Sequence, residues 1–265
     1  MIKTRFAPSP TGYLHFGSLR TALYCYLWAR KHQGIFMLRV EDTDQSRLVS
    51  DATDKLMATL EIFGLSPDEG PNHDLGNGPY YQSQRLELYQ ERLHALAKSG
   101  GAYYCFCTSE RLDTLRTEQE ALKLPLKYDG CCRDLAYEES YARVQAGESY
   151  TIRLRVPLAQ KLEMNDLIRG RIEFNTSEVE DQVLLKSDGF PTYHGAIVID
   201  DYLMGVTHVM RGEEWISSIP KQILTARALE IDLPAYAHMP NIMGADGKKL
   251  SKRTGDTAVE SYLEK

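Results

Sequence analysis

An alternation of strand and helix patterns at the start of the chain constrains its fold more than any other feature. Residues 2–7 form a short run of β type, residues 19–30 repeat apolar side chains at helical spacing, and residues 36–40 form a second β-type run. A strand, a helix and a strand joined by a short crossover imply parallel strands in an open α/β sheet, whose ligands gather at the carboxyl ends of the strands. The sequence therefore predicts an α/β fold with a binding site at those strand ends.

The middle of the chain has a different character. Two more helices are predicted at 51–63 and 83–98, but from Tyr103 the pattern changes to a Cys-Phe-Cys step, a polar helix near 109–122 and β-rich segments such as 149–156. This middle segment is therefore predicted to be an inserted domain.

The α/β pattern resumes near Pro191 and continues to a helix predicted near 217–229. We therefore expect a discontinuous α/β domain, an insertion and a lysine-rich last segment. The predicted boundaries are 1–100 and 188–246 for the α/β domain, 101–187 for the inserted domain and 247–265 for the last segment.

Composition and charge narrow the class of protein. A hydrophobic content of 43%, a charged content of 26% and the lack of any apolar run long enough to span a bilayer are typical of soluble globular proteins. The N-terminus lacks the basic-then-apolar layout of a secretory signal, so we expect a cytoplasmic monomer without membrane attachment. A formal net charge of -6 argues against indiscriminate nucleic-acid binding and permits a local basic track for one shaped RNA.

The loop at 8–18, between the first strand and the first helix, has the features of a phosphate-binding turn. Free backbone N–H groups and the positive end of a helix dipole meet there, and Gly12 and Gly17 permit close approach of a ligand to the backbone. His15 offers a donor to a phosphate oxygen as charge builds up during attack on phosphorus. The alternative interpretation is a Pro/Gly loop with a capping serine and an incidental histidine, because an H-x-G pattern alone is weakly specific.

A second cationic motif lies near the other end of the chain. Lys249, Lys252 and Arg253 place three cations within five residues, flanked by Gly247 and Gly255. Such side chains can clamp a triphosphate and stabilise a departing pyrophosphate, although most basic clusters are solvated turns. The combination of an H-x-G turn at the start of the α/β domain and a K-x-S-K loop at its end favours a nucleotide site.

Six words in sequence order, spread over nearly the whole chain, resemble the glutamyl-tRNA synthetases, a family of class I aminoacyl-tRNA synthetases. The words are RFAPSPTGYLHFGSLRTALY, LRVEDTD, GPYYQSQR, DGFPTY, HVMRGEEWISSIPKQIL and GKKLSKR, and the first and last contain the two signature motifs of the class. The resemblance implies a Rossmann-like parallel sheet with an inserted α+β domain that contacts the acceptor stem of a tRNA. It also implies a ligase that activates L-glutamate with ATP and transfers it to the 3′ end of tRNA(Glu).

The resemblance assigns residues to this chemistry. No nucleophilic side chain is required, because the carboxylate of glutamate itself attacks ATP, so catalysis consists of positioning and charge stabilisation with Mg²⁺ bridging the phosphates. Polar turn residues explain Asp42 and Asp44 more simply than a metal site does, and Trp215 is either a stacking surface or a packing surface. The implied catalytic residues are His15, Gly17, Lys249, Ser251 and Lys252, and the implied ATP-binding residues are His15, Gly17, Ser18, Glu214, Trp215, Leu250, Lys252 and Arg253.

A pocket for glutamate must neutralise two carboxylates and hold one ammonium group, which requires two cations and an acidic group. Arg5 on the first strand, Glu41 at the end of the next and Arg211 after the segment 206–210 meet that requirement. We expect Arg5 to pair with the side-chain carboxylate, because bidentate guanidinium recognition discriminates against the amide of glutamine. The amino-acid site implied by the resemblance comprises Arg5, Ala7, Ser9, Glu41, Tyr193 and Arg211.

Ordinary structural roles remain open for these residues. Arg5 or Arg211 could form an ion pair with one of the acidic residues nearby in the fold, and Tyr193 could belong to the core. Ile197 stands where some family members have a polar contact, which leaves one wall of the pocket open. The acidic candidates for those ion pairs are Asp200, Asp201 and Glu213.

The cysteines favour a metal site over disulfides, because five cysteines is an odd number in a chain without an export signal. Cys105-x-Cys107 is followed 24 residues later by Cys131-Cys132, a spacing that suits tetrahedral Zn²⁺. Some members of the family join a Cys-x-Cys pair to a Tyr-x3-Cys element, so the resemblance implies structural Zn²⁺ held by Cys105, Cys107, Tyr128 and Cys132. Tyr128, Cys131 and Asp134 compete for the fourth position, reduced cysteines without metal are the alternative, and Cys25 is expected in the core.

Two other functions stay open. A glutamyl-queuosine tRNA(Asp) synthetase is favoured by His15-Phe16-Gly17-Ser18 and by the Tyr128-x3-Cys132 spacing, but the words GPYY and RGEEW favour the full synthetase. A non-catalytic RNA-binding paralogue is disfavoured by Arg5, His15, Lys249 and Lys252. The sequence stops where the family normally continues into stem-contacting and anticodon-binding helices, as expected of a chain cut at a domain boundary or of a naturally short protein.

Overall fold

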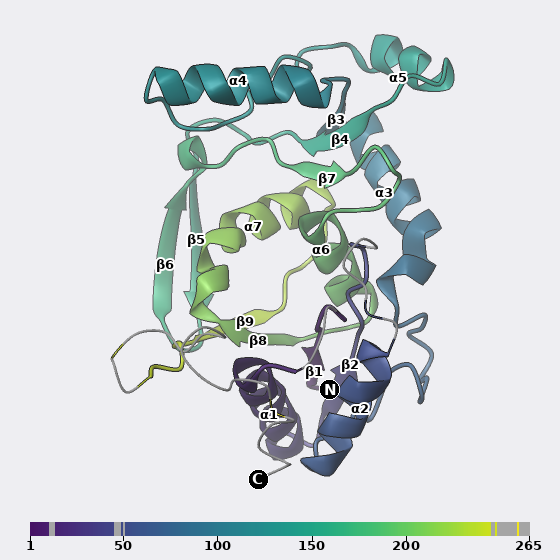
Figure 1. The fold of residues 1–265 in the computed structure, drawn as a ribbon, viewed down its shortest axis with the longest axis vertical. Helices are drawn as coiled ribbons and strands as arrows, with labels where there is room; N and C mark the ends of the chain where they lie inside the picture. Colours follow the sequence, from purple (N-terminus) through teal and green to yellow (C-terminus); the bar gives the residue numbers. More distant parts are fainter. Residues whose placement is uncertain (11–13, 45–48, 50, 245–246, 248–258, 260–265) are drawn as a thin grey trace.

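A six-stranded sheet forms the frame of the molecule in the computed structural model (Figure 1). The structure describes residues 1–10, 14–44, 49, 51–244, 247 and 259. Neighbouring strands run parallel except for the last pair, which forms an antiparallel hairpin. In sheet order the strands are β2 (Ile35–Leu38), β1 (Lys3–Phe6), β8 (His208–Gly212), β9 (Ala235–Met239), β5 (Lys161–Asp166) and β6 (Gly170–Asn175).

The strand order places a topological switch between β1 and β8. From β1 the chain passes through helix α1 (Phe16–Lys31) to β2 on one side, whereas β8 and β9 lie on the other side. In open α/β sheets such a switch leaves a crevice at the carboxyl ends of the two strands, where ligands bind. The predicted α/β class and its strand, helix, strand opening are therefore confirmed.

Local sequence explains the opening unit. Helix α1 starts at the N-cap His15, buries Leu19, Ala22, Cys25 and Ala29 on one face, and carries basic residues in its last turn, where they complement the helix dipole. The turn into β2 requires Gly34, because a Cβ at that position would lie 2.2 Å from the carbonyl oxygen of Ile2. The absence of a side chain there lets β2 pair directly with β1.

The other helices of the α/β part lie against the six-stranded sheet or extend away from it (Figure 1). The helices predicted at 51–63 and 83–98 are confirmed, the second with a 3₁₀ turn before it. The segment after Pro191 forms a helix whose N-cap Thr192 accepts a hydrogen bond from the N–H of Gly195. The bounds are α2 (Ala52–Ile62), η2 (Gln82–Arg85), α3 (Leu86–Lys98), α6 (Tyr193–Leu203), η4 (Glu213–Ser218) and α7 (Ile219–Ala228).

A second, three-stranded sheet lies at the end of the molecule opposite to α1 and α2, beneath helices α4 and α5 (Figure 1). Its strand order is β3-β4-β7, with antiparallel pairing throughout. The polar helix predicted near 109–122 is confirmed as α4. The bounds are β3 (Ala102–Cys105), α4 (Ser109–Ala121), α5 (Tyr137–Gln145), β4 (Thr151–Leu154), η3 (Thr176–Glu178) and β7 (Val183–Leu185).

The two sheets share one hydrophobic cluster. It includes Tyr89 of α3, Ile152 of β4, Ile199 of α6 and Ile223 of α7. In addition, the β5–β6 hairpin comes from the segment 101–187 but extends the larger sheet by pairing with β9. The middle segment is thus joined to the α/β part through both core packing and strand pairing, and the proposed domain boundaries stay a prediction.

Among the described residues, no helix is long and apolar enough to cross a lipid bilayer.

Candidate active site

A cavity of about 460 Å³ opens at the carboxyl ends of β1 and β8. It lies where the strand order switches, as the sequence predicted for a ligand site. Every predicted site residue that is described and belongs to the nucleotide or amino-acid set lines this one cavity. These residues are Arg5, Ala7, Ser9, His15, Gly17, Ser18, Glu41, Tyr193, Arg211, Glu214 and Trp215. The remaining predicted residues, Lys249, Leu250, Ser251, Lys252 and Arg253, lie outside the described residues.

The N-terminus of α1 supplies the polar end of the cavity. The Nδ1 atom of His15 accepts a hydrogen bond from the backbone N–H of Gly17 at 3.0 Å. A neutral imidazole that accepts at Nδ1 carries its proton on Nε2, so the outer edge of His15 is a hydrogen-bond donor. The donor, the helix N-terminus and Ser18 together give this end of the cavity the chemistry that suits an anion.

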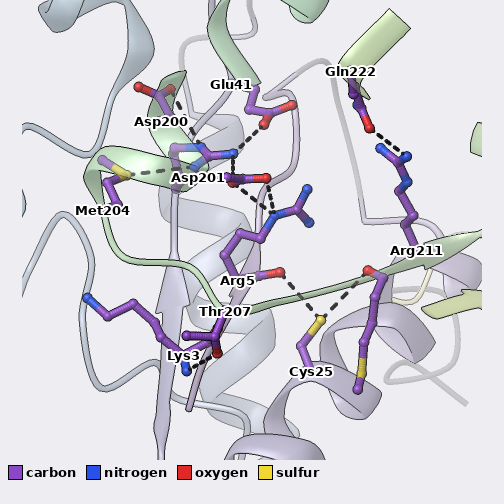
Figure 2. A network of polar contacts seen from close by, with 12 residues as sticks. Lys3, Arg5, Cys25, Glu41, Asp200, Asp201, Met204, Thr207, Arg211 and Gln222 are labelled. Carbon is purple, nitrogen blue, oxygen red and sulfur yellow. Dashed lines mark hydrogen bonds and ion pairs between the residues drawn. The ribbon is translucent and has the colours of Figure 1, made fainter. Parts of the chain in front are cut away.

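Arg5 forms an ion pair inside the protein and still faces the cavity. Its Nε atom lies 3.2 Å from Oδ1 of Asp201, and the residue is only 5% exposed. Figure 2 shows its terminal nitrogens pointing away from Asp201. The sequence left open whether Arg5 pairs with an acidic neighbour or with a ligand. In the structure its Nε atom pairs with Asp201, and its terminal nitrogens remain directed away from that carboxylate, where a ligand could reach them.

A buried network of opposite charges holds Arg5 and Glu41 in place (Figure 2). The guanidinium of Arg39, which is fully buried, lies 2.8 Å from Asp201 and 3.1 Å from Glu41. Burial alone raises the pKa of the Asp201 carboxyl, but the nearby Arg5 and Arg39 bring it below its ordinary value. Asp201 therefore remains ionised and anchors both arginines.

The network continues beneath the cavity through Asp200. This carboxylate accepts hydrogen bonds from Arg85 Nε at 2.9 Å, Gln82 Nε2 at 2.8 Å and the hydroxyl of Tyr89 at 2.7 Å. Buried charges are stable only when they are paired and hydrogen-bonded in this way. Asp200 and its three partners are all buried, so this carboxylate is paired inside the protein.

Glu41 is the acidic group that faces the cavity. It is 9% exposed, and burial raises the pKa of its carboxyl despite the opposing effect of Arg39 and Arg5. A cationic ligand group beside Glu41 would favour its ionised form. Asp42, the next residue, has a structural role as expected of a polar turn residue: its carboxylate accepts hydrogen bonds from the N–H and the hydroxyl of Ser83.

Arg211 differs from Arg5 because its hydrogen bonds go to neutral groups. Its Nε donates to Nε2 of His238 at 3.0 Å, and its terminal nitrogens donate to Tyr193 Oη at 3.2 Å and Gln222 Oε1 at 2.9 Å. Within the described part of the chain, no carboxylate forms an ion pair with this buried guanidinium. Its positive charge is therefore uncompensated where it meets the cavity.

Aromatic rings close the side of the cavity beside Arg211. The ring centroids of Tyr193 and Trp215 are 4.7 Å apart, and Trp215 is 37% exposed. The carboxylate of Glu214 turns back beside the strand end into the space that Gly212 leaves open; with a Cβ at residue 212, 2.1 Å from that carboxylate oxygen, the Glu214 side chain would have to move. Tyr193 lines the cavity and also packs against a buried cluster that includes Ile197 and Val198.

His194, next to Tyr193 in the sequence, is expected to make the stability of the fold depend on pH. Burial, with the nearby Lys221 and Arg211, lowers the pKa of His194 to about 4. The unfolded chain takes up a proton near pH 6.5 and the folded chain does not, so stability is full above that pH and is lost as the pH falls toward 4. Between pH 7.5 and pH 5 the loss attributable to this group amounts to about 2 kcal/mol.

Urea unfolding at the two pH values checks this expectation. His194→Phe keeps a ring of similar size and removes the titrating group, so the stability difference between pH 7.5 and pH 5 is expected to shrink by about 2 kcal/mol. Tyr202→Phe on the same helix is the matched control, since it alters an aromatic side chain, 46% exposed, without removing a histidine and is expected to leave the difference unchanged. An equal pH dependence in the His194→Phe variant and in the wild type contradicts the expectation.

Comparison with known proteins shows the family to which the chain belongs. The sequence profile of tRNA synthetases class I (E and Q), catalytic domain, matches residues 1–265. The chain belongs to this synthetase family.

Relatives within the family are glutamate--tRNA ligases. That of Clostridioides difficile is 52% identical over 272 residues, covering 100% of this chain and 55% of that protein. That of Alkaliphilus metalliredigens is 49% identical over 271 residues with the same coverage. The crystal structure of a glutamate tRNA ligase from Elizabethkingia meningosepticum in complex with its amino acid matches with a TM-score of 0.91 at 43% identity, covering 96% of this chain and 52% of that one. The chain thus spans about half the length of the relatives it matches.

Three of the five cysteines gather at the end of β3. The sulfur atoms of Cys105, Cys107 and Cys132 all lie within 4.8 Å of one another. The Sγ atoms of Cys107 and Cys132 are 3.8 Å apart, which is the edge expected of a tetrahedron around Zn²⁺ with Zn–S bonds of about 2.3 Å. The three thiols therefore fit a tetrahedral zinc site.

The same geometry favours Tyr128 at the fourth position. Its hydroxyl oxygen lies 3.3 Å from Sγ of Cys105 and 3.6 Å from Sγ of Cys107, beside the three thiols and within reach of an ion that they would hold. Cys131 and Asp134 are exposed, and neither belongs to the group of converging ligand atoms found among the described residues. Cys25 is buried in α1, away from this cluster, as expected of a core residue.

The buried residues that hold Arg5, Glu41 and Arg211 in place were not predicted from the sequence. It indicated Asp200 and Asp201 only as competitors for the arginines, and it gave no role to Arg39, Asp166 or His238. Arg39 was visible as a charged residue inside a β-type run beside Glu41, which is unusual for a buried parallel strand. Asp166 and His238 carried no such signal, because their pairing depends on the hairpin that joins the large sheet.

Proposed function

We propose that this chain activates L-glutamate with ATP to form glutamyl-adenylate and transfers the glutamyl group to the 3′ end of a tRNA. The observation that carries the proposal is a single cavity holding two buried arginines, a buried glutamate and a helix N-terminus at the switch point of the sheet. The naming of relatives with the same catalytic part as glutamate--tRNA ligases supports the same substrates.

The amino-acid end of the cavity matches the charges of glutamate. Arg5 and Arg211 are two cations for two carboxylates, and Glu41 is an anion for the ammonium group. Each is buried, so the desolvation cost of an unmatched charge would select against ligands that lack the complementary group. The terminal nitrogens of Arg5 are assigned to the side-chain carboxylate, because a guanidinium has only donors and cannot accept a hydrogen bond from the amide NH₂ of glutamine.

The nucleotide end is assigned to the N-terminus of α1. His15 would donate from Nε2 to a phosphate oxygen, and the backbone at Gly17 and Ser18 would approach the same phosphates. Trp215 and Glu214 are assigned to the adenosine side. Lys249, Ser251, Lys252 and Arg253, with Leu250, are proposed to complete the triphosphate clamp on the basis of the family motif.

Magnesium would be carried by the nucleotide in this arrangement. The converging group of metal-ligand atoms found among the described residues is the cysteine set, not a carboxylate cluster beside the cavity. Mg²⁺ commonly binds through substrate phosphates with few protein carboxylates, and it neutralises charge on them. The chain's own contribution is to orient the glutamate carboxylate toward the phosphate and to exclude water from the pocket floor.

The segment 101–187 is proposed to contact the acceptor stem of the tRNA, with a structural Zn²⁺ held by Cys105, Cys107, Tyr128 and Cys132. A structural role follows from the ligand set, because four protein ligands leave no open position for catalysis. The bound ion would connect the end of β3 to the turn before α5 and thereby stabilise this end of the molecule.

The zinc proposal predicts stoichiometry and ligand identity. The purified chain is expected to hold one Zn²⁺, and Cys105→Ser and Cys132→Ser are expected to lose it. Tyr128→Phe is expected to weaken zinc binding by at least about 10-fold without abolishing it. Elemental analysis and competition with a chromogenic chelator measure both effects. Cys131→Ser is the matched control: loss of zinc from that variant would overturn the assignment.

Pyrophosphate exchange tests the proposed reaction. The chain is incubated with ATP, labelled pyrophosphate and either glutamate, glutamine or aspartate, each with and without tRNA. The proposal predicts exchange that depends on glutamate and is much slower with the other two amino acids. Exchange independent of tRNA would favour a glutamyl-queuosine type of enzyme, and no exchange under any condition would favour a non-catalytic paralogue.

A further inference from the structure

Arg211 is held by a contact that depends on the protonation state of a histidine. The Nε–H of Arg211 donates to Nε2 of His238 at 3.0 Å. A guanidinium has only donors, so this bond exists only when Nε2 of His238 carries no proton. Both side chains are buried, and an unpaired donor there would be costly.

Asp166 fixes that protonation state. Its Oδ2 lies 2.6 Å from Nδ1 of His238, and neither side chain is exposed to solvent. A carboxylate at Nδ1 requires the proton on Nδ1, which leaves Nε2 as the acceptor that Arg211 needs. The three residues therefore form one chain of hydrogen bonds that ends at the cavity.

The surroundings of His238 keep it in the neutral form. Burial is the largest cause that lowers the pKa of His238; Arg211 and Arg169 lower it further, and Asp166 opposes them. The ring of Tyr236 stacks at a centroid distance of 5.9 Å. A protonated His238 would place a second cation against Arg211, so the neutral tautomer is the one compatible with the structure.

Asp166 is itself held rigidly at the end of β5. Its Oδ1 accepts hydrogen bonds from the backbone N–H groups of Ile168 and Arg169, both at 2.9 Å. The backbone of Asp166 is the partner of Tyr236 in the pairing of β5 with β9. The anchor of the chain of hydrogen bonds thus comes from the β5–β6 hairpin and lies on a different element from Arg211.

We propose that Asp166 and His238 are positioning residues for the amino-acid site, which hold the guanidinium of Arg211 in the orientation that receives a carboxylate of glutamate. The inference rests on the proposed function, since it names what supports one of the two substrate-binding arginines. It assigns no contact with the substrate to either residue. It predicts that glutamate recognition depends on which nitrogen of His238 carries the proton.

Asp166→Asn is the sharpest test, because it changes one atom. The amide oxygen can still accept the N–H groups of Ile168 and Arg169, and it remains the acceptor for the backbone N–H of His238, which in the wild type donates to Oδ1 at 3.3 Å and to Oδ2 at 3.1 Å. The amide NH₂ replaces Oδ2 and donates to Nδ1 of His238. The proton of His238 is then driven to Nε2, where it opposes the Nε–H of Arg211. We expect the KM for glutamate to rise by about 30-fold, the effect of a lost hydrogen bond to a charged group, with the KM for ATP changed by less than about 3-fold.

A spectroscopic readout separates positioning from general damage. In ¹⁵N spectra of the histidine rings, His238 of the wild type is expected to show a protonated Nδ1 and a free Nε2, and Asp166→Asn is expected to reverse them. Asp74→Asn is the matched control, because Asp74 also accepts backbone N–H groups in a turn but is exposed and does not line the cavity. It is expected to leave both KM values unchanged.

A second pair of variants decides the matter if Asp166→Asn does not fold. His238→Gln keeps an acceptor for Arg211 and is expected to stay within about 5-fold of the wild-type KM for glutamate, whereas His238→Met removes the acceptor and is expected to raise that KM by about 30-fold. A wild type with Nε2 protonated, or a KM for glutamate unchanged within about 2-fold in both Asp166→Asn and His238→Met, overturns the inference. Absence of glutamate-dependent exchange in the wild type instead overturns the proposed function.

Discussion

Replacing Arg211 by glutamine is expected to raise the KM for glutamate by about 100-fold or more while the KM for ATP changes little. The reason is that the guanidinium is buried and carries no carboxylate partner within the described residues, so its charge is available to the ligand. Loss of one member of a buried charged pair costs about 2–5 kcal/mol, which corresponds to a factor of about 30 to several thousand in affinity.

Steady-state pyrophosphate exchange at varied glutamate and varied ATP measures this effect. Arg211→Lys is a useful intermediate, because lysine keeps the charge but cannot donate to His238 and toward the cavity at once. Arg171→Gln is the matched control, since Arg171 is an exposed arginine that pairs with Glu163 on the β5–β6 hairpin. A change of less than about 5-fold in the KM for glutamate of the Arg211→Gln variant would show that this arginine does not bind the substrate.

Replacing Arg39 by methionine is expected to lower the free energy of unfolding by about 3–5 kcal/mol. Arg39 is fully buried and lies between Asp201 and Glu41, with Asp200 at 3.8 Å. Methionine leaves these carboxylates buried with too few cations, and an uncompensated buried charge is strongly destabilising. Because domains of this size are stable by only about 5–15 kcal/mol, the variant is expected to be close to unfolding at ordinary temperatures.

Chemical denaturation followed by circular dichroism measures the change. Arg116→Met is the matched control, because Arg116 pairs with Asp113 on the surface of α4, with the arginine side chain 63% exposed. Exposed ion pairs of this kind contribute about 0–1 kcal/mol, so that variant is expected to resemble the wild type. Equal stabilities of the Arg39→Met and Arg116→Met variants would contradict a structural role for the buried network.

The sequence predicted those parts of the fold that depend on local pattern. The opening strand, helix and strand, the helices α2, α3 and α4, and the position of the site at strand ends all follow from periodicity and from turn residues. The residues that line the cavity were also predictable, because sequence segments such as RFAPSPTGYLHFGS and HVMRGEEW contain both these residues and the strand ends and turns that position them.

Long-range pairings were not predictable in the same way. The β5–β6 hairpin belongs to the middle segment in the sequence, yet it joins the large sheet through β9, and only this placement brings Asp166 to His238. Likewise, Asp200 and Asp201 lie on α6, far along the chain from Arg39, and the sequence alone does not show which charges neutralise one another. Such pairs depend on tertiary packing, which periodicity does not encode.

The most direct measurement of the central claim is a crystal structure of the chain with L-glutamate bound. We expect glutamate in the cavity at the ends of β1 and β8, with its ammonium group at Glu41, its side-chain carboxylate at the terminal nitrogens of Arg5 and the other carboxylate within reach of Arg211. Glutamate bound elsewhere on the protein, or bound in this cavity with both carboxylates turned away from the two arginines, would contradict it.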